Sequence, residues 1–388
     1  MRIICTIGLV LWAPGAACAA DAPGSSVPAP PSSVISDWAS RGVPAAGGLP
    51  SPAAANWMTG LATLVSPCGL ALDKDGNFLI TDIDRMMVFK MTPQGALSVI
   101  AGLPGMVGSA NGPSSRATFN FPTNVVVDKE GNLIVADAEN SAVRKISPTG
   151  MVTNILDDQR RINLITANGS VTLLPAPLDF PSGLAVDAAG NIFVADPVNN
   201  VVSKISSKGE VSTVAGKPGV DGAVDGKAAE VRFGLPRAVA VDPAGVLYVA
   251  DEEYNTIRKV AADGSVTTLA GNPNLPEGAP GRDGTGIGAT FVSPRGLTLD
   301  AKGNIYVADT NGHTIRKITP GGVVTTIAGK TGVAGSADGK GDAARFNGPR
   351  GIVVDKDGNI FVADMGNGRI RKITPEGVVT TIGKTPTK

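Results

Sequence analysis

The sequence predicts an all-β protein, and three observations lead to that fold class. Gly and Pro account for 50 and 29 of the 388 residues, a share well above average usage and typical of a fold with many turns. The hydrophobic fraction of 43% is enough for a large core and excludes global disorder. The third observation is an internal repeat with short strand-like runs in every copy. Many short strands joined by Gly- and Pro-rich turns are typical of sandwiches, barrels and propellers.

The repeat is defined by two aspartates that always lie nine residues apart. Each copy opens with a proline and runs through an apolar segment to the first aspartate, and a turn and a second apolar segment lead to the second one. The first aspartates are Asp73, Asp128, Asp187, Asp242, Asp300 and Asp355, and the second are Asp82, Asp137, Asp196, Asp251, Asp309 and Asp364. Because the six copies share one internal register, one structural unit repeats along most of the chain.

The sixth copy shows the order of elements within the unit. Its strand-like runs are Gly351–Val354, Asn359–Ala363, Arg369–Ile373 and Val378–Ile382, and short turns with Gly and Pro connect them. Four antiparallel strands repeated six times predict a six-bladed β-propeller of four-stranded blades. A single blade cannot bury its own faces, so each blade must be covered by its neighbours, which explains why the runs are apolar on both faces.

The repeat resembles the NHL family. The resemblance is carried by the pattern Pro-x-Gly-apolar-Ala-Val-Asp-x-x-Gly-Asn-apolar-x-Val-Ala-Asp and by the segment from Asn367 to Lys372 with its counterparts. It covers about residues 66–383, and copies five and six match best, whereas the first copy departs from the pattern at residues 84–90. The resemblance implies an exported six-bladed propeller of bacterial type. It implies little about function, because this fold hosts many roles.

The first 55 residues predict export. Residues 1–20 combine a positive charge, a short apolar run and small residues at a cleavage site, as a secretory signal peptide does. Lipidation of Cys18, which would attach the protein to an envelope, is an alternative. Residues 21–55 read as a Pro/Ala/Ser-rich linker, itself another route of envelope attachment, and residues 56–388 as the propeller. We therefore expect a secreted or periplasmic protein without a transmembrane segment.

Long loops occur at only one end of the predicted blades, the end that carries the connections between blades. Each follows an Ala-Gly pair and ends in Phe-x-x-Pro, and this shared pattern predicts that the loops pack on their own blades with Phe as an anchor. The loops are Gly102–Asn120, Lys217–Gly234, Asn272–Val292 and Lys330–Asn347. The segment Ile155–Pro177, which contains Arg160 and Arg161, breaks the pattern and is a candidate for specific contacts.

The second aspartate of each copy predicts a scaffold role. In four copies an arginine follows it by seven residues, whereas Phe89 and Ser203 take this position in copies one and three. We expect each aspartate to accept backbone N–H bonds in the turn that follows it or to pair with its arginine. The arginines are Arg144, Arg258, Arg316 and Arg371.

The residue after each opening proline predicts a ligand site. It starts the innermost strand at the channel mouth, on the long-loop end, and its six identities are Cys68, Thr123, Ser182, Arg237, Arg295 and Arg350. Three successive blades would thus place arginines along one side of the mouth, where guanidinium groups favour carboxylate, phosphate or sulfate. We predict ligand binding there, with Thr123 and Ser182 completing the site. The alternative is that the arginines pair with acids of nearby turns, such as Asp84, Glu139, Glu252 and Glu253.

These features favour an exported binding or interaction module that uses its long-loop face and has no cofactor. The expected partner is a protein, or an anionic small molecule or glycan, at the channel mouth. Lys and Arg number 34 and Asp and Glu also number 34, so the formal net charge is zero. A chain without a positive field is a poor candidate for binding nucleic acid.

The alternative function is a divalent-metal-dependent hydrolase or lyase similar to the gluconolactonases. Lactonases of that type hold a divalent metal in the channel with carboxylates and asparagine, so the resemblance would assign Ca²⁺ or another divalent ion to Asp84, Glu139 and Asn124. His313 is the only histidine, which excludes multi-histidine zinc sites. No residue is assigned a catalytic role, and whether the chain is an enzyme stays open.

Overall fold

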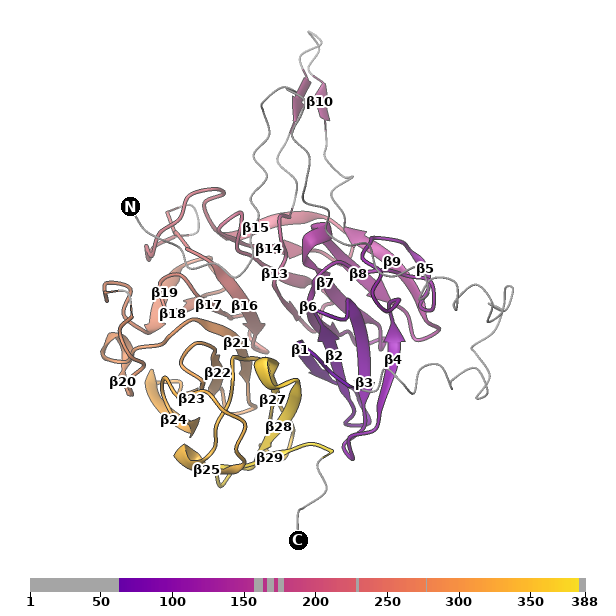
Figure 1. Ribbon diagram of the computed structural model, residues 1–388. Helices are drawn as coiled ribbons and strands as arrows, with labels where there is room; N and C mark the ends of the chain where they lie inside the picture. Colours follow the sequence, from indigo (N-terminus) through magenta and orange to yellow (C-terminus); the bar gives the residue numbers. More distant parts are fainter. Residues whose placement is uncertain are drawn as a thin grey trace, which may run out of the picture. The chain divides into compact units, whose positions relative to one another are not determined.

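The computed structural model describes residues 63–383, apart from residues 157–162, 166–170, 174–177, 228–229 and 277. All of these belong to one unit, which spans Asn56–Lys388. The expected signal peptide at 1–20 and linker at 21–55 lie outside the described residues. The described residues form strands and turns, with only short 3₁₀ segments between them (Figure 1).

Six antiparallel sheets form the blades, and each contains four strands that are consecutive in sequence. Blades one, two and three contain β1 (Pro67–Leu72) to β4 (Leu97–Ala101), β6 (Pro122–Val127) to β9 (Met151–Leu156), and β12 (Gly183–Val186) to β15 (Val211–Gly216). Blades four, five and six contain β16 (Pro236–Val241) to β19 (Val266–Ala270), β21 (Pro294–Leu299) to β24 (Val323–Gly329), and β26 (Pro349–Val354) to β29 (Val378–Thr381). The middle strands are β2 (Phe78–Asp82), β3 (Met87–Met91), β7 (Leu133–Asp137), β8 (Ala142–Ile146), β13 (Ile192–Asp196), β14 (Val201–Ile205), β17 (Leu247–Asp251), β18 (Thr256–Val260), β22 (Ile305–Asp309), β23 (Thr314–Ile318), β27 (Ile360–Asp364) and β28 (Arg369–Ile373). The predicted six-bladed β-propeller is confirmed.

The turn between the first two strands of a blade is fixed by its first aspartate. In blade six, Asp355 Oδ1 accepts the backbone N–H groups of Asp357 and Asn359 at 2.9 and 2.8 Å. Gly358 lies at a φ of 81°, a conformation that glycine adopts without steric cost. The carboxylate is therefore occupied by its own turn, which accounts for the repeated aspartate without a metal ion.

The blades close into a ring through their innermost strands. Strand β1 contacts β6, and the contacts continue through β12, β16, β21 and β26 back to β1. Figure 1 labels four of these innermost strands, β1, β6, β16 and β21, near the centre of the ring. Among the described residues, blades one and six exchange no strand, so side-chain packing joins the two ends of the propeller. Phe78 of blade one and Phe361 of blade six meet with their ring centroids 4.8 Å apart.

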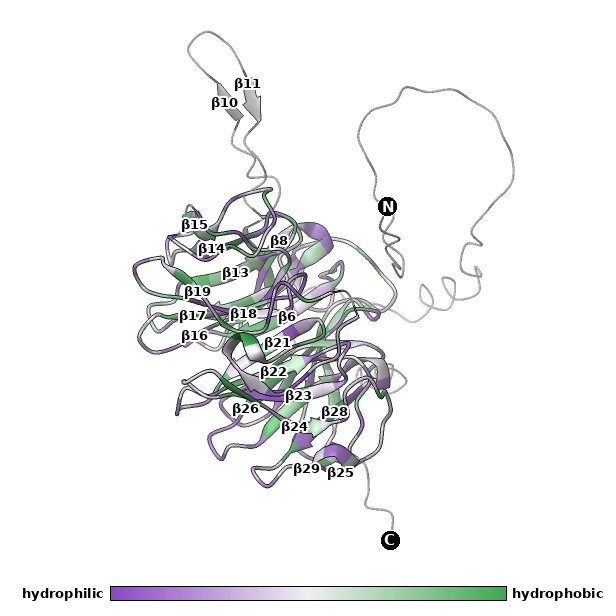
Figure 2. Cartoon of the chain, turned by 90° about the vertical axis from the view of Figure 1, so that its left-hand side faces the viewer, coloured by the Kyte–Doolittle hydropathy of each residue, from purple (hydrophilic) through white to green (hydrophobic). Residues whose placement is uncertain are grey.

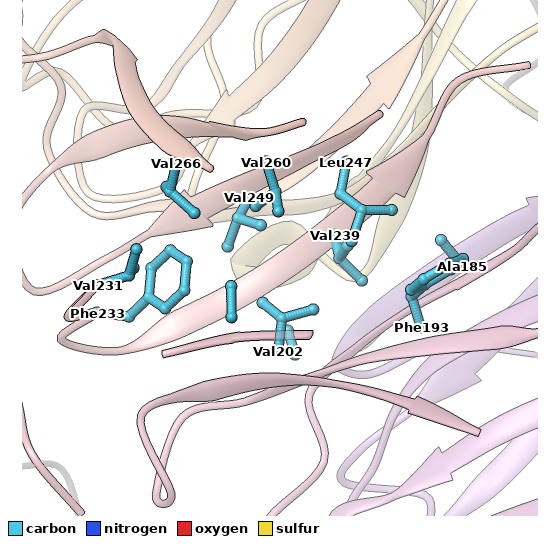
Figure 3. Close-up of a cluster of buried hydrophobic side chains, with 12 residues drawn as sticks. Ala185, Phe193, Val202, Val231, Phe233, Val239, Leu247, Val249, Val260 and Val266 are labelled. Atoms are coloured by element: carbon cyan, nitrogen blue, oxygen red, sulfur yellow. The ribbon is translucent and has the colours of Figure 1, made fainter. Parts of the chain in front are cut away.

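The hydrophobic core lies between neighbouring blades. Figure 3 shows one such layer, in which Ala185 and Phe193 of blade three pack near Val239 and Val249 of blade four. Figure 2 shows the same distribution over the whole ring, with hydrophobic residues along the strands and hydrophilic residues in many of the turns. Each blade therefore depends on both neighbours for burial of its apolar residues.

The long loops cross from the ring to the outer edge of the blade that follows. Strands β5 (Gly112–Pro113), β20 (Gly284–Thr285) and β25 (Gly339–Lys340) lie in these loops and pair with the outermost strands β9, β24 and β29. In the loop before blade three, β10 (Asn163–Ile165) pairs with β11 (Val171–Leu173). Arg160 and Arg161 of that loop lie outside the described residues.

A buried arginine anchors each of the four patterned loops, and blade five shows the arrangement. Arg316 is fully buried, and its Nη1 donates to Asp309 Oδ2 at 3.2 Å and to the carbonyl of Thr290 at 3.0 Å. Its Nη2 donates to Asp283 Oδ1 in the loop at 2.9 Å. The Phe291 ring lies 5.1 Å from the guanidinium carbon, which adds a cation–π contact. The predicted self-packing with Phe as anchor is confirmed.

The second aspartates bind backbone as well as arginine. Asp309 Oδ1 accepts the N–H of Val292, and Asp364 Oδ1 accepts that of Asn347, in each case 17 residues earlier in the chain. Most of these N–H groups belong to the loop before the blade rather than to the turn after the aspartate, where Asp82 accepts the N–H groups of Asp84 and Arg85. The carboxylates therefore tie each incoming loop to its blade.

Blades one and three lack the arginine, and they also lack the phenylalanine. The Phe ring comes 25 residues before the arginine in four blades, and the residues at this spacing before Phe89 and Ser203 are Leu64 and Leu178. The two partners of the stacked pair are thus replaced together. This joint replacement is expected because a phenylalanine without a guanidinium, or a buried guanidinium without its ring, would pack poorly.

Removal of Arg316 should destabilise the propeller strongly. The R316M variant leaves the buried Asp309 carboxylate without its cation, and we expect a loss of about 3 to 5 kcal/mol in the free energy of unfolding, measured by urea denaturation. The D309N/R316M double variant should lose less, because no charge is left unpaired. The exposed K302M substitution is the control and should change stability by less than about 0.5 kcal/mol. Equal losses in R316M and K302M would contradict the anchoring role.

Asp196 of blade three should make stability depend on pH. Burial raises the pKa of Asp196 from 3.8 to about 6, although Asn199 and the backbone N–H groups of Asp179 and Asn199 oppose the shift. The folded state therefore binds this proton more tightly than the unfolded state does, and stability falls as pH rises through the interval from 4 to 6, by about 3 kcal/mol.

The D196N variant removes this titration. Its stability relative to the natural chain should rise between about pH 4 and about pH 6, as urea unfolding at several pH values would measure. The exposed D75N variant serves as the control. Parallel curves for D196N and the natural chain would show that Asp196 does not titrate in this interval.

Candidate functional site

The candidate site lies where the innermost strands begin. In every blade except the third, the opening proline pairs with the second aspartate, as Pro236 does with Asp251 and Pro349 with Asp364. The residue after the proline and the residue after the aspartate are therefore neighbours at one end of the ring. In blade four these two residues are Arg237 and Glu252.

Glu252 holds two of the three predicted arginines. Its Oε2 accepts a bond of 2.6 Å from Arg237 Nε in the same blade, and its Oε1 accepts Nε of Arg295 from blade five at 2.8 Å. Nη2 of Arg295 donates to the same oxygen. The side chain of Glu252 is 10% exposed and those of the arginines are 24% and 25% exposed, so the triad is half-sheltered from solvent. The predicted alternative, pairing with Glu252, occurs for these two arginines.

The charges at this site act on one another. Burial by itself would raise the pKa of Glu252, but the charges of Arg237 and Arg295 outweigh it and hold the pKa below its usual value. Burial lowers the pKa of Arg295, and the nearby charges of Arg350 and Arg237 lower it further, against the opposing charge of Glu252. Arg237, Arg295, Arg350 and Glu252 therefore form one electrostatic unit, here named the arginine cluster.

Arg350 has no carboxylate partner among the described residues. Its Nη1 lies 3.5 Å from Sγ of Cys68 in blade one, and its Nε is buried without a hydrogen-bond acceptor. Thr310, which follows the second aspartate of blade five, directs its hydroxyl to the carbonyl of Pro349 at 2.7 Å. The three arginines thus share a single acid, and the cluster keeps an excess of positive charge.

The remaining members of the predicted site are neutral. Thr123 is buried, and its hydroxyl lies 3.1 Å from the carbonyl oxygens of both Pro181 and Ser182, so it joins blades two and three. The backbone N–H of Ser182 donates to Ala195 in its own blade. At the position after the opening proline, the residues of blades four to six are therefore charged and those of blades one to three are neutral.

The structure gives a contact for each residue of the metal alternative, and the contact involves the side chain only at Asp84. Asp84 accepts a hydrogen bond from the hydroxyl of Ser66, and the N–H of Glu139 donates to the carbonyl of Asn120. Asn124 lies within β6, opposite Ala136. In the part of the chain that the structure describes, no group of three or more His, Cys, Asp or Glu residues could hold a metal ion. His313 Nδ1 accepts the N–H of Gly348 across the junction between blades five and six.

Three long loops place an exposed apolar residue on the same face. Met106, Val220 and Val333 each donate a backbone N–H to the residue three positions earlier, in equivalent turns, and are 55%, 37% and 40% exposed. The turns of Val220 and Val333 lie beside the connections between second and third strands, because Gly219 donates to Asn199 and Gly332 to Gly312. The face around the arginine cluster therefore offers apolar contacts as well.

The sequence analysis did not predict that one acid, Glu252, pairs with arginines of two blades. The signal was present, because the residues after the second aspartates are Ile83, Ala138, Pro197, Glu252, Thr310 and Met365, and only one of them is acidic. It also missed the contact between Arg350 and Cys68, which are 282 residues apart in sequence and meet only because the ring closes.

No helix long and apolar enough to cross a membrane is found within the described residues. A family model described as the teneurin NHL domain matches residues 106–277, and one described as the NHL repeat matches residues 291–318 and 346–373. Teneurin-3 of Danio rerio is 28% identical over 274 residues, which are 68% of this chain. The match covers only 8% of the length of that curated relative.

Solved structures share the fold. An auxiliary nutrient binding protein from Bacteroides thetaiotaomicron is similar with a TM-score of 0.58 and 16% identity, over 82% of this chain and 70% of that one. Virginiamycin B lyase from Staphylococcus aureus is similar with a TM-score of 0.52 and 15% identity, over 84% and 88% of the two chains. A binding protein and a lyase thus have the same fold, which by itself does not select a function.

The two NHL models together match more than half of the residues, and the matched segments fall on blades of the ring. The chain belongs to the NHL-repeat family of six-bladed β-propellers.

Proposed function

We propose that this propeller is a binding module that captures an anionic group of a ligand or protein partner at the arginine cluster. The observation that carries the proposal is the charge imbalance at the mouth, where Arg237, Arg295 and Arg350 share Glu252 as their only acid among the described residues. A rigid ring built from packed blades is a suitable support for such a site, because ligand binding then costs little ordering of the protein.

The charge imbalance is local. The chain as a whole has a formal net charge of zero and therefore no overall positive field that would attract anions. The excess of positive charge is confined to the arginine cluster. Arg295 is held by Glu252 in a half-sheltered position, where a charge-assisted hydrogen bond is stronger than in bulk water. An anion at the cluster would lower the mutual repulsion of its arginines.

The apolar residues of the long loops support a larger partner as well. Met106, Val220 and Val333 are exposed on the face that carries the cluster. Interfaces commonly combine a few apolar anchors with arginine. A protein or glycan that presents an anionic group could therefore contact the loops and the cluster together.

The proposal predicts anion binding that depends on Arg295 and Arg350. The melting temperature of the natural chain should rise with acetate, succinate, phosphate or sulfate when chloride keeps the ionic strength constant. An anion at about 100 times its dissociation constant would stabilise the folded state by about 2.7 kcal/mol. The R295M/R350M variant should lose this rise, and it leaves Glu252 paired with Arg237.

The matched control is R116M/R282M, which removes two exposed arginines from long loops and changes the net charge equally. It should respond to anions as the natural chain does. If none of the four anions distinguishes the two double variants, the cluster is not an anion site.

We also propose that the chain is exported, on the strength of the signal-like residues 1–20. Mass spectrometry of the protein recovered from its cells should find a chain that begins after residue 19 or 20. A lipid-bearing Cys18 at the amino terminus would indicate an envelope-attached form instead, and an intact Met1 in the mature protein would contradict export by this signal.

A further inference from the structure

Glu252 shows how a carboxylate occupies the arginine cluster. It follows Arg237 by 15 residues, and the pair lies beside the backbone pairing of Pro236 with Asp251. Its carboxylate reaches Arg237 through Nε and Arg295 through Nε and Nη2. Both arginines of the propeller that bind this carboxylate thus do so through Nε.

Blade six repeats the same framework without the acid. Met365 follows Arg350 by 15 residues, and Pro349 pairs with Asp364 as Pro236 pairs with Asp251. The residue at the position of Glu252 is therefore Met365, which is half-buried and cannot accept a strong hydrogen bond. Nε of Arg350, the counterpart of the atom that binds Glu252 in blade four, is buried without an acceptor among the described residues.

An unpartnered buried N–H of a charged group is costly. The four scaffold arginines also have a buried Nε without an acceptor, but their Nη atoms bind carboxylates, whereas no nitrogen of Arg350 binds a carboxylate of the described residues. Thr310, on the other side of Arg350, donates its hydroxyl to the carbonyl of Pro349. Cys68 contacts Nη1 of Arg350 at 3.5 Å and leaves Nε free. The side chains that the structure places at Arg350 and at its preceding residue are thus those of Cys68 and Thr310, and neither is a carboxylate.

We propose that a carboxylate of the ligand occupies, at Arg350, the place that the Glu252 carboxylate occupies at Arg237. This inference rests on the proposed function and narrows it to a ligand class. A carboxylate accepts from the Nε edge of a guanidinium, as Glu252 does in the same ring, where Oε1 accepts both Nε and Nη2 of Arg295 and Oε2 accepts Nε of Arg237. It carries one negative charge, which lowers the excess of positive charge that three arginines and one glutamate leave in the cluster. The apolar side chain of Met365 suits the carbon skeleton next to the carboxylate.

The test introduces a carboxylate beside Arg350 by substitution of Met365. In the full-length M365E variant the carboxylate of the new side chain should bind Arg350 Nε. The M365Q variant is the control, because its side chain has a similar size and no charge. The readout is the Nε–H signal of Arg350 in a ¹⁵N-labelled sample, assigned by its loss in R350K. We expect acetate to shift this signal saturably in the natural chain and in M365Q. In M365E the signal should already lie near the shifted position, and the affinity for acetate should fall at least about tenfold.

A second measurement uses another variant and does not depend on the folding of M365E. R350K keeps the positive charge but removes the guanidinium edge, and its affinity for acetate, measured by calorimetry, should also fall at least about tenfold. Succinate and the peptide acetyl-Gly-Glu-Gly-amide distinguish the two sources of the carboxylate. A small-molecule ligand predicts tighter binding of succinate, and a protein partner predicts tighter binding of the peptide.

Two results would overturn the inference and leave the proposed function intact. One is acetate binding to M365E as tightly as to M365Q, and the other is binding of phosphate or sulfate at least about tenfold tighter than that of acetate. If no anion shifts the Arg350 signal and the R295M/R350M variant responds to anions as the natural chain does, the proposed function fails as well.

Discussion

The buried second aspartate of each blade holds the loop that enters the blade, and in four of the six blades a buried arginine pairs with it. In blade five, Arg316 and Asp309 are both fully buried and hydrogen-bonded to one another. The same two side chains bind the loop that enters the blade, through Asp283, Thr290 and Val292. Because removing either partner would leave an uncompensated charge, the pair fixes the path of the loop over the blade. The position of the candidate site follows from that path.

The loops of blades two, four, five and six are therefore scaffold for most of their length. Their phenylalanines are buried against the guanidinium groups, and their aspartates or asparagine bind the outer nitrogens of the same groups. The surfaces left for contact with a partner are the short turns at the start of three of these loops and the inner rim of the propeller. Function in this fold is thus confined to positions that the repeat does not use for itself.

The arginine cluster is such a position, because its residues differ from blade to blade. The repeat requires a proline and an aspartate there. The residue after the proline varies among arginine, threonine, serine and cysteine, and the residue after the aspartate differs in all six blades. Glu252 bridges blades four and five and so adds to the cohesion of the ring. Arg350 lies at the junction of blades six and one, where packing closes the ring, and it gains no such bridge.

The sequence by itself determined the number of blades, the four strands in each, and the loops anchored by phenylalanine, because these depend on spacings that are repeated six or four times. It also placed three arginines at one end of the ring. Only the tertiary structure decided which of them is paired, because Arg295 and Glu252 belong to different blades and Arg350 meets Cys68 through ring closure. A repeat specifies what its copies share, whereas contacts between unlike residues of neighbouring copies depend on side-chain directions that the sequence does not reveal.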